Sequence, residues 1–192
     1  MRYQKISAVP GSQKNAHGFT LFELLVAVVI LVIMTTIAIP GLSAQIQNSR
    51  ANAALFEMFS TLSLARSEAI KRGHRVGLCP SSNGLSCNNS FRWHNGWILF
   101  KDPDRNGMPD TANTLIIYHN VDINIRILTT SGRRKVIYQP DGTVTGNSNM
   151  TMTFCRPLTN QYPDQIVQSQ SGRIRVNKKV RAGASLCQKT AG

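Results

Sequence analysis

Hydrophobic residues cover every face of a stretch near the N-terminus, Phe19–Ile39, which has 21 residues and one ionisable group, Glu23. At about 1.5 Å per residue, such a helix is roughly 31 Å long, enough to cross the hydrocarbon core of a bilayer. A helix in the core of a soluble domain is rarely apolar on every face over this length. The pattern therefore predicts a membrane-spanning helix.

A second pattern, typical of an amphipathic helix, follows Pro40. Hydrophobic residues recur there at steps of three and four, and charged residues fill the other face. Gly73 follows two cations, Lys71 and Arg72, as is typical of a helix end. We expect one helix from about Phe19 to Arg72, roughly 80 Å long, whose second half, residues 40–73, packs on a globular domain. The recurring hydrophobic residues are Leu55, Met58, Phe59, Leu62, Ala65 and Ala69.

From His74 onward, short runs rich in β-branched and aromatic residues alternate with clusters of turn residues. This alternation predicts a β-rich domain over residues 74–192, a length that suits one modest hydrophobic core. Together with the helix, it predicts an α+β fold in which the long N-terminal helix packs on an antiparallel β-sheet. The expected strands are Val76–Cys79, Trp97–Phe100, Thr114–Tyr118, Ile123–Ile127, Val136–Tyr138, Met150–Phe154 and Gln165–Gln168.

The residues before the apolar run, Met1–Gly18, are polar and include Arg2, Lys5 and Lys14 but no acid. A secretory signal places its small cleavage-site residue after the apolar run, whereas Gly18 comes before it. Cleavage after Gly18 would leave the apolar helix at the new N-terminus. The positive leader keeps this end in the cytoplasm, so the bulk of the chain is expected outside it.

Glu23 is unusual because a carboxylate inside a membrane span is costly unless it is paired. It lies in the first turn of the expected helix, where the helix dipole favours negative charge. A free amino group on Phe19, in the same chain or in a neighbouring subunit, is its natural partner. The alternative is a glutamate that reaches the lipid headgroups.

The sequence Gly18-Phe-Thr-Leu-Phe-Glu-Leu, followed by the apolar run and Pro40, resembles the class III signal of type IV pilins and type II secretion pseudopilins. The resemblance implies that a prepilin peptidase cuts between Gly18 and Phe19 and methylates Phe19. It also implies that Glu23 guides packing with other major and minor pilins, and that Pro40 kinks the helix. The chain would lie in the bacterial inner membrane with a periplasmic domain, and outside the cell once assembled in a pilus.

The four cysteines are Cys79, Cys87, Cys155 and Cys187, an even number in a part expected to lie outside the cytoplasm. Disulfides are the default there. Of the three possible connectivities we favour Cys79–Cys87 with Cys155–Cys187, because the first pair closes a short loop of turn residues. A zinc site is disfavoured because no Cys-x-x-Cys spacing occurs.

The net charge is +13, from 22 basic and 9 acidic residues, and it is unevenly distributed. Residues 19–125 have eight basic and seven acidic residues, net +1, whereas residues 126–192 have eleven basic and two acidic residues, net +9. This asymmetry indicates a polyanionic partner.

The most basic stretch is Gln170–Arg181. If residues 173–177 form a strand, Arg173, Arg175 and Asn177 share one face, with the two guanidinium groups roughly 6.6 Å apart along the strand. That separation is comparable to the phosphate spacing along one DNA strand, and arginine makes bidentate phosphate contacts. Further cations extend the charge: Lys178, Lys179 and Arg181.

Gly172-Arg173-Ile-Arg175 resembles the Gly-Arg-x-Arg motif of FimT proteins, which bind DNA during natural transformation. With the long helix and the four cysteines, the layout most resembles the GspH/FimT-type minor pilins. The resemblance implies a DNA-binding role for Gly172, Arg173 and Arg175. The alternative is a solvated edge strand, in which cations only prevent edge pairing.

A second basic cluster, Arg133, Arg134 and Lys135, lies in a turn before a strand. It could share the DNA surface or be a solvated turn, and the sequence leaves both open. No aromatic residues are interleaved with either cluster, so stacking of single-stranded bases is not indicated. We expect salt-sensitive, sequence-nonspecific binding to the backbone of double-stranded DNA.

The segment Asp102-Pro-Asp104-Arg-Asn106-Gly107 begins like a calcium loop, with side-chain oxygens at alternate positions, glycine sixth and Asp110 as a further candidate ligand. However, the twelfth position is Asn113 rather than glutamate, and Arg105 lies inside the loop. We favour a turn built from side-chain hydrogen bonds.

No catalytic site or cofactor is expected, since His74, His94 and His119 have neither ligand spacing nor a nucleophile partner. Three functions remain. The first is a minor pilin that binds DNA for uptake. The second is a structural minor pilin that primes pilus assembly, and the third is a type II secretion pseudopilin. The one-sided charge favours the first.

Overall fold

The computed structural model describes residues 18–110, 114–119, 125–130, 132–146, 150–155 and 162–189. Within its helices, the side chains of 37–41, 44, 182, 188 and 189 are outside the description. The chain divides into two compact units, Met1–Leu42 and Ser43–Gly192, each of which is described by itself.

Helix α1, Leu21–Arg72, is 52 residues long, and the boundary between the two units falls inside it. Thr20 caps the helix, because its Oγ1 accepts a hydrogen bond from the Glu23 backbone N–H at 3.3 Å. In the first unit the large hydrophobic side chains from Phe19 to Met34 are exposed. The only ionisable residue described among them, Glu23, is also exposed.

Across the part of the chain that the structure describes, no helix combines the length and apolarity needed to cross a membrane. The span expected over residues 19–39 reaches into 37–39, whose side chains lie outside the described part. Helix α1 continues through Pro40, where a kink is expected, and only the side chain of Pro40 is outside the description.

The second unit contains the rest of α1, which is amphipathic as the sequence predicts. Its buried face consists of the small or hydrophobic residues at three- and four-residue steps, and it includes five of the six expected positions. Gly73 ends the helix with a φ of +68°, and its N–H donates to the Ala69 carbonyl at 3.1 Å. The buried hydrophobic residues are Ala51, Ala54, Leu55, Met58, Leu62, Ala65 and Ala69, and Thr61 is buried beside them.

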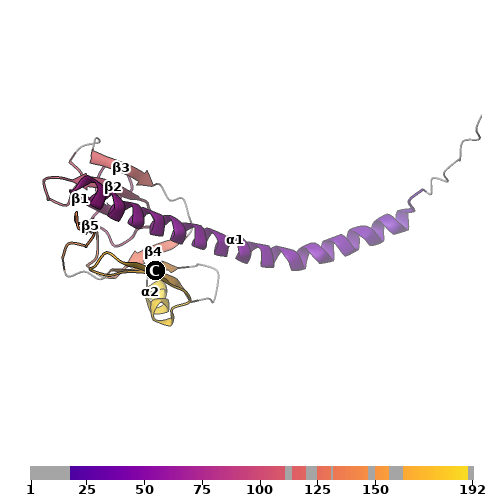
Figure 1. Cartoon of the computed structure of the whole chain (residues 1–192). Helices are drawn as coiled ribbons and strands as arrows, with labels where there is room; N and C mark the ends of the chain where they lie inside the picture. The colour runs from indigo at the N-terminus through magenta and orange to yellow at the C-terminus, as the bar shows by residue number, and fades with distance from the viewer. Residues whose placement is uncertain are drawn as a thin grey trace, which may run out of the picture. The chain divides into compact units, whose positions relative to one another are not determined.

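The strands form two four-stranded antiparallel sheets (Figure 1). The first sheet has the order β3-β2-β1-β5, and the second has the order β4-β6-β7-β8. The strands of the first sheet are β1 Arg75–Pro80, β2 Trp97–Asp102, β3 Leu115–His119 and β5 Val136–Tyr138. The strands of the second sheet are β4 Arg126–Thr129, β6 Met150–Cys155, β7 Asp164–Gln168 and β8 Ile174–Asn177.

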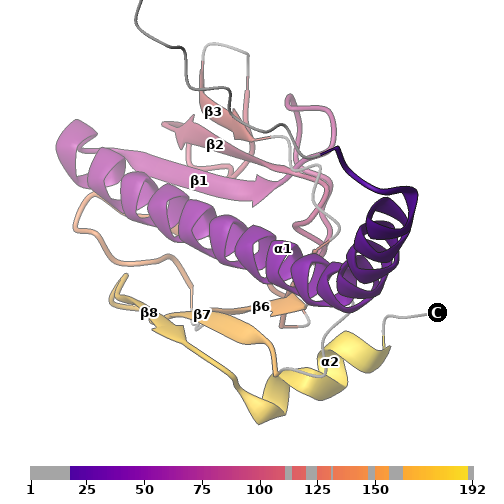
Figure 2. The ribbon, with the colours of Figure 1, turned by 90° about the vertical axis from the view of Figure 1, so that its right-hand side faces the viewer.

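The second half of α1 lies between the two sheets, with β1–β3 on one side and β6–β8 on the other (Figure 2). One continuous core joins the helix to both sheets; it includes Met58 and Leu62 from the helix, Trp97 from the first sheet, and Phe154 and Ile166 from the second. The expected α+β class is confirmed. The division of the strands into two sheets was not part of the sequence prediction.

Two disulfides each tie a segment outside the sheets to a strand. Cys79–Cys87 closes the loop that follows β1, and Cys155–Cys187 ties the end of β6 to a short helix, α2 Ala184–Lys189. A 3₁₀ turn, Arg181–Gly183, leads into α2, and the Arg126 guanidinium donates to the Cys187 carbonyl at 2.8 Å. This helix, which the sequence analysis did not predict, lies beside the second sheet (Figures 1 and 2).

Candidate nucleic-acid interface

Strand β8 is the outer strand of the second sheet, and it has the alternation that the sequence predicts. Ile174 and Val176 are half-buried and pack against the core, whereas Arg175 and Asn177 are exposed. Arg175 lies opposite Val167 of β7. Arg173, directly before the strand, is also exposed. The strand therefore places Arg173 and Arg175 on its solvent face.

The turn that leads into β8 is fixed by contacts with distant parts of the unit. Gly172 has a φ of +76°, and its N–H donates to the Ser169 carbonyl at 3.0 Å. A Cβ at Gly172 would overlap the carbonyl oxygen of Gly142, which belongs to the turn after β5. From α1, the Arg66 guanidinium reaches the Ser171 carbonyl at 3.4 Å. The β7–β8 turn is thus held by two other elements.

Basic residues continue beyond the strand. Lys178 and Lys179 are exposed, and the Lys179 backbone N–H donates to the buried carboxylate of Asp164 at 2.9 Å. The Arg181 guanidinium lies 5.5 Å from the centre of the Tyr162 ring. We call Arg173, Arg175, Lys178, Lys179 and Arg181 the β8 basic strip.

Among the described residues, Glu68 forms an ion pair with Arg72, and Glu57 contacts the His119 imidazole; neither contact involves a residue of the β8 basic strip. The hydrogen bond from Arg72 holds the pKa of the Glu68 carboxyl below its ordinary value. The strip's own cations form no ion pair with a described acid. Their charge is directed to solvent, where it can attract an anionic ligand.

The second cluster lies elsewhere. Arg133, Arg134 and Lys135 follow β4, which is at the opposite edge of the second sheet from β8. The Lys135 ammonium donates to the Gly107 carbonyl at 2.9 Å, so this side chain is occupied by the β2–β3 loop. The sequence left open whether the two clusters form one surface. In the structure, the second cluster connects β4 to β5 of the first sheet, and β4 and β8 are the two edge strands of the second sheet.

The segment after β2 is a turn built from side-chain hydrogen bonds, the form that the sequence analysis favours. Asp102 accepts from the Gly107 N–H at 2.9 Å, and Asn106 accepts from the Met108 N–H at 2.6 Å. In the described part of the chain, no three His, Cys, Asp or Glu side chains are grouped to hold a metal ion.

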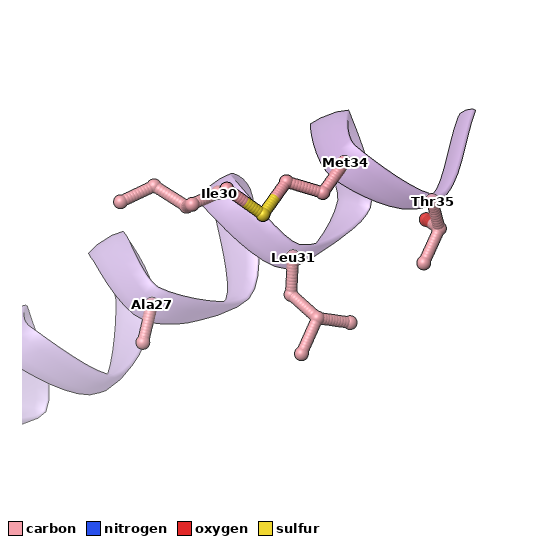
Figure 3. Close-up of a pocket in the computed structure, with 5 residues that line it drawn as sticks. All are labelled: Ala27, Ile30, Leu31, Met34 and Thr35. Carbon is pink, nitrogen blue, oxygen red and sulfur yellow. The ribbon is translucent and has the colours of Figure 1, made fainter. Parts of the chain in front are cut away.

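The signal residues lie at the start of the first unit. Gly18 and Phe19 are exposed and precede α1, and Glu23 lies in its first turn. Further along, five side chains border a shallow hollow (Figure 3): Ala27, Ile30, Leu31, Met34 and Thr35. All five come from the same helix, so the hollow is part of an apolar helix surface and not an enclosed ligand cavity.

Solved structures with a similar fold include those of a minor pilin. Two crystal forms of the type IV minor pilin FimU from Pseudomonas aeruginosa match with TM-scores of 0.53 and 0.54 at 17% identity. Each match covers 69% of this chain, and 93% and 88% of the FimU chain respectively. The minor pseudopilin EpsH of the Vibrio cholerae Type 2 Secretion System matches with a TM-score of 0.48 at 12% identity, covering 67% of this chain and 97% of EpsH.

With its long N-terminal helix packed on antiparallel sheets, the chain has the type IV pilin fold. Residues 54–178 match the family model described as type II transport protein GspH, and residues 13–39 match the prokaryotic N-terminal methylation motif. The chain belongs to the GspH family of minor pilins and pseudopilins. No curated protein sequence matches the chain.

Proposed function

We propose that this chain is a minor pilin that binds double-stranded DNA through the β8 basic strip and supports DNA uptake in natural transformation. The observation that carries the proposal is the pair Arg173 and Arg175, both exposed on one strand and neither in an ion pair with a described acid. Their separation of roughly 6.6 Å along the strand suits successive phosphates. Gly172, held against Gly142, fixes the point where the pair begins.

The binding is electrostatic and independent of base sequence. Arginine and lysine contacts to phosphates give affinity without reading bases, and they release counterions, so affinity falls with salt. Lys178, Lys179 and Arg181 extend the contact beyond β8. The cluster Arg133, Arg134 and Lys135 is not included in the proposed site, because it follows the opposite edge strand.

The N-terminal part places the strip on a filament. A prepilin peptidase removes Met1–Gly18 and methylates Phe19, and the remaining apolar helix holds the chain in the inner membrane with its domain in the periplasm. Glu23 then guides assembly with other pilins. Once the subunit is in the pilus, retraction draws bound DNA toward the cell.

A second candidate function is a structural subunit that primes filament assembly or acts in type II secretion without binding DNA. The family description, a type II transport protein, favours it. The two functions share the signal and the fold, and they differ in whether the β8 basic strip has a ligand.

The test uses the full-length, oxidised chain in nonionic detergent, titrated against a short fluorescent duplex at several salt concentrations. We expect binding that weakens with salt. In the double variant Arg173→Gln/Arg175→Gln, we expect at least a roughly tenfold loss, and a salt slope smaller by about 2, because two phosphate contacts are lost. Circular dichroism checks that the variant is folded.

The matched control is Arg133→Gln/Arg134→Gln, which removes the same charge from the other edge of the sheet. This variant should bind nearly as well as the wild type. Equal losses in both double variants would mean that net charge, and not the β8 basic strip, binds DNA. No binding by the wild type at low salt would leave the structural function as the better account.

A further inference from the structure

The side chain of Arg66, from α1, lies where two turns of the second unit meet. Its Nε would be 3.0 Å from a Cβ added at Gly142, in the turn after β5, and 3.1 Å from a Cβ added at Gly172, in the turn before β8. Both glycines have positive φ angles, +78° and +76° respectively. The guanidinium therefore lies against the backbone of both turns, and a side chain at either glycine would crowd it.

Two hydrogen bonds from outside the β7–β8 turn set its placement on the unit. The Val144 N–H, from the segment after β5, donates to the Gln170 carbonyl at 2.9 Å. The Arg66 Nη2 donates to the Ser171 carbonyl at 3.4 Å. Of these two donors, Arg66 alone acts through its side chain. Arg173 lies two residues beyond Ser171, so a displacement of the turn also displaces the start of the β8 basic strip.

Packing alone does not explain an arginine at this position. The Nε of Arg66 is buried and has no hydrogen-bond acceptor among the described residues. A buried donor without an acceptor is costly, and an apolar side chain of similar size would avoid that cost. The arginine is thus better explained by its contacts with the two turns than by a gain in stability.

We propose that Arg66 is a positioning residue for DNA binding, which holds the β7–β8 turn so that Arg173 and Arg175 are aligned for successive phosphates. Bidentate phosphate contacts require a fixed direction of each guanidinium, and a pair that is already aligned loses less conformational entropy on binding. Arg66 acts through the turn and does not itself contact the duplex. This inference rests on the proposed function, because it concerns the alignment of the same strip.

The first test is hydrogen exchange of the full-length, oxidised chain in detergent, measured by mass spectrometry. In Arg66→Gln, peptides that cover residues 165–177 should exchange at least roughly fivefold faster, while peptides from β1 should be unaffected, because only the turn opens more often. Arg50→Gln is the matched control, since it removes an exposed cation from the same helix and should exchange as the wild type does. Unchanged exchange in Arg66→Gln overturns the proposal, whether or not the chain binds DNA.

The second test is a double-mutant cycle in the duplex titration, at a salt concentration low enough to measure weak binding. Arg66→Gln should weaken binding roughly fivefold in the wild-type background and add no loss to Arg173→Gln/Arg175→Gln, because it acts through that pair. Arg50→Gln should bind as the wild type does.

The outcomes of the cycle separate this inference from the proposed function. An equal loss from Arg66→Gln in both backgrounds would indicate a direct contact or a general charge effect, and would overturn the inference. Weak binding by Arg173→Gln/Arg175→Gln with unchanged binding by Arg66→Gln would overturn the inference alone and leave the proposed function standing. No binding by the wild type would overturn the proposed function and this inference with it.

Discussion

Gly172 shows how one residue can determine the position of the proposed binding surface. Its φ of +76° lies in the left-handed region, and a side chain there would overlap the Gly142 carbonyl. Two turns, one after β5 and one before β8, therefore touch through their backbones. Because Arg173 follows directly, the placement of its guanidinium depends on the absence of a Cβ at Gly172.

Gly172→Ala should lower the free energy of unfolding by about 3 kcal/mol or more, because it combines left-handed strain with a backbone clash. Gly73→Ala is the matched control, since Gly73 has a φ of +68° and a Cβ added there would meet no atom within 4 Å. It should cost only about 1–2 kcal/mol. Urea unfolding measures both, and equal costs would contradict the contact with Gly142.

His94 is expected to make the stability of the domain depend on pH. Burial lowers the pKa of its imidazole below the ordinary value of 6.5, so the folded state binds this proton less readily than the unfolded state. Below that value the unfolded chain takes up more protons, and stability falls with falling pH.

His94→Gln should therefore lose less stability than the wild type when the pH is lowered from about 7.5 to about 5.5. Urea unfolding of both proteins at the two pH values measures the difference, and each variant serves as its own reference at the higher pH. Parallel losses in the two proteins would show that His94 contributes nothing.

At the scale of elements, the two disulfides close loops of very different length, with sequence separations of 8 for Cys79–Cys87 and 32 for Cys155–Cys187. In the chain-entropy model, the shorter loop contributes about 2.5 kcal/mol and the longer one about 3.7 kcal/mol. The longer bridge also holds α2, which follows the 3₁₀ turn that begins at Arg181, the last residue of the β8 basic strip.

We expect Cys155→Ala/Cys187→Ala to cost about 1 kcal/mol more in unfolding free energy than Cys79→Ala/Cys87→Ala. The first double variant should also bind DNA more weakly, because Lys178–Arg181 lose the anchor that follows them. Chemical unfolding and the duplex titration measure the two effects. A larger loss of stability from the shorter loop would contradict this account.

Regular patterns along the chain predicted most elements. The three- and four-residue steps from Leu55 to Ala69 indicated the buried face of α1, and the helix ends at Arg72 as expected. Seven expected strands have counterparts within a few residues, although residues 123 and 124 of one lie outside the described part. Helix α2 was missed because six residues are too few for a periodic pattern, and a disulfide holds them in place.

The division into two sheets could not be read from the sequence, because it depends on which strands pair. Val136–Tyr138 looks like any other buried strand, yet it pairs with β1 and not with β4, its predecessor along the chain. The order of strands within the second sheet also places β4, which Arg133 and Arg134 follow, at the opposite edge from β8. Alternation along β8 predicted the exposed face of the candidate site. Which basic residues belong to that site could be decided only from the order of the strands in the sheet.

At the scale of the whole molecule, the number of basic residues suggests a larger basic surface than the structure presents to a polyanion. Eleven basic residues lie in 126–192, but five of them form the β8 basic strip. Arg126 donates to the Cys187 carbonyl and Lys135 to the Gly107 carbonyl, so part of the excess charge has a structural use. Net charge suggested a polyanionic ligand, whereas contacts determine which cations could meet such a ligand.

The order of the strands also has a consequence for how the domain folds. Val136 of β5 pairs with Leu78, and β5 lies in sequence between β4 and β6, which belong to the other sheet. Neither sheet is therefore a continuous piece of chain, and the first cannot be completed before β4 has been made. Pairing across such separations makes folding slow and leaves strand edges open meanwhile. A newly synthesised chain would thus depend on protection from aggregation until its last strands have paired.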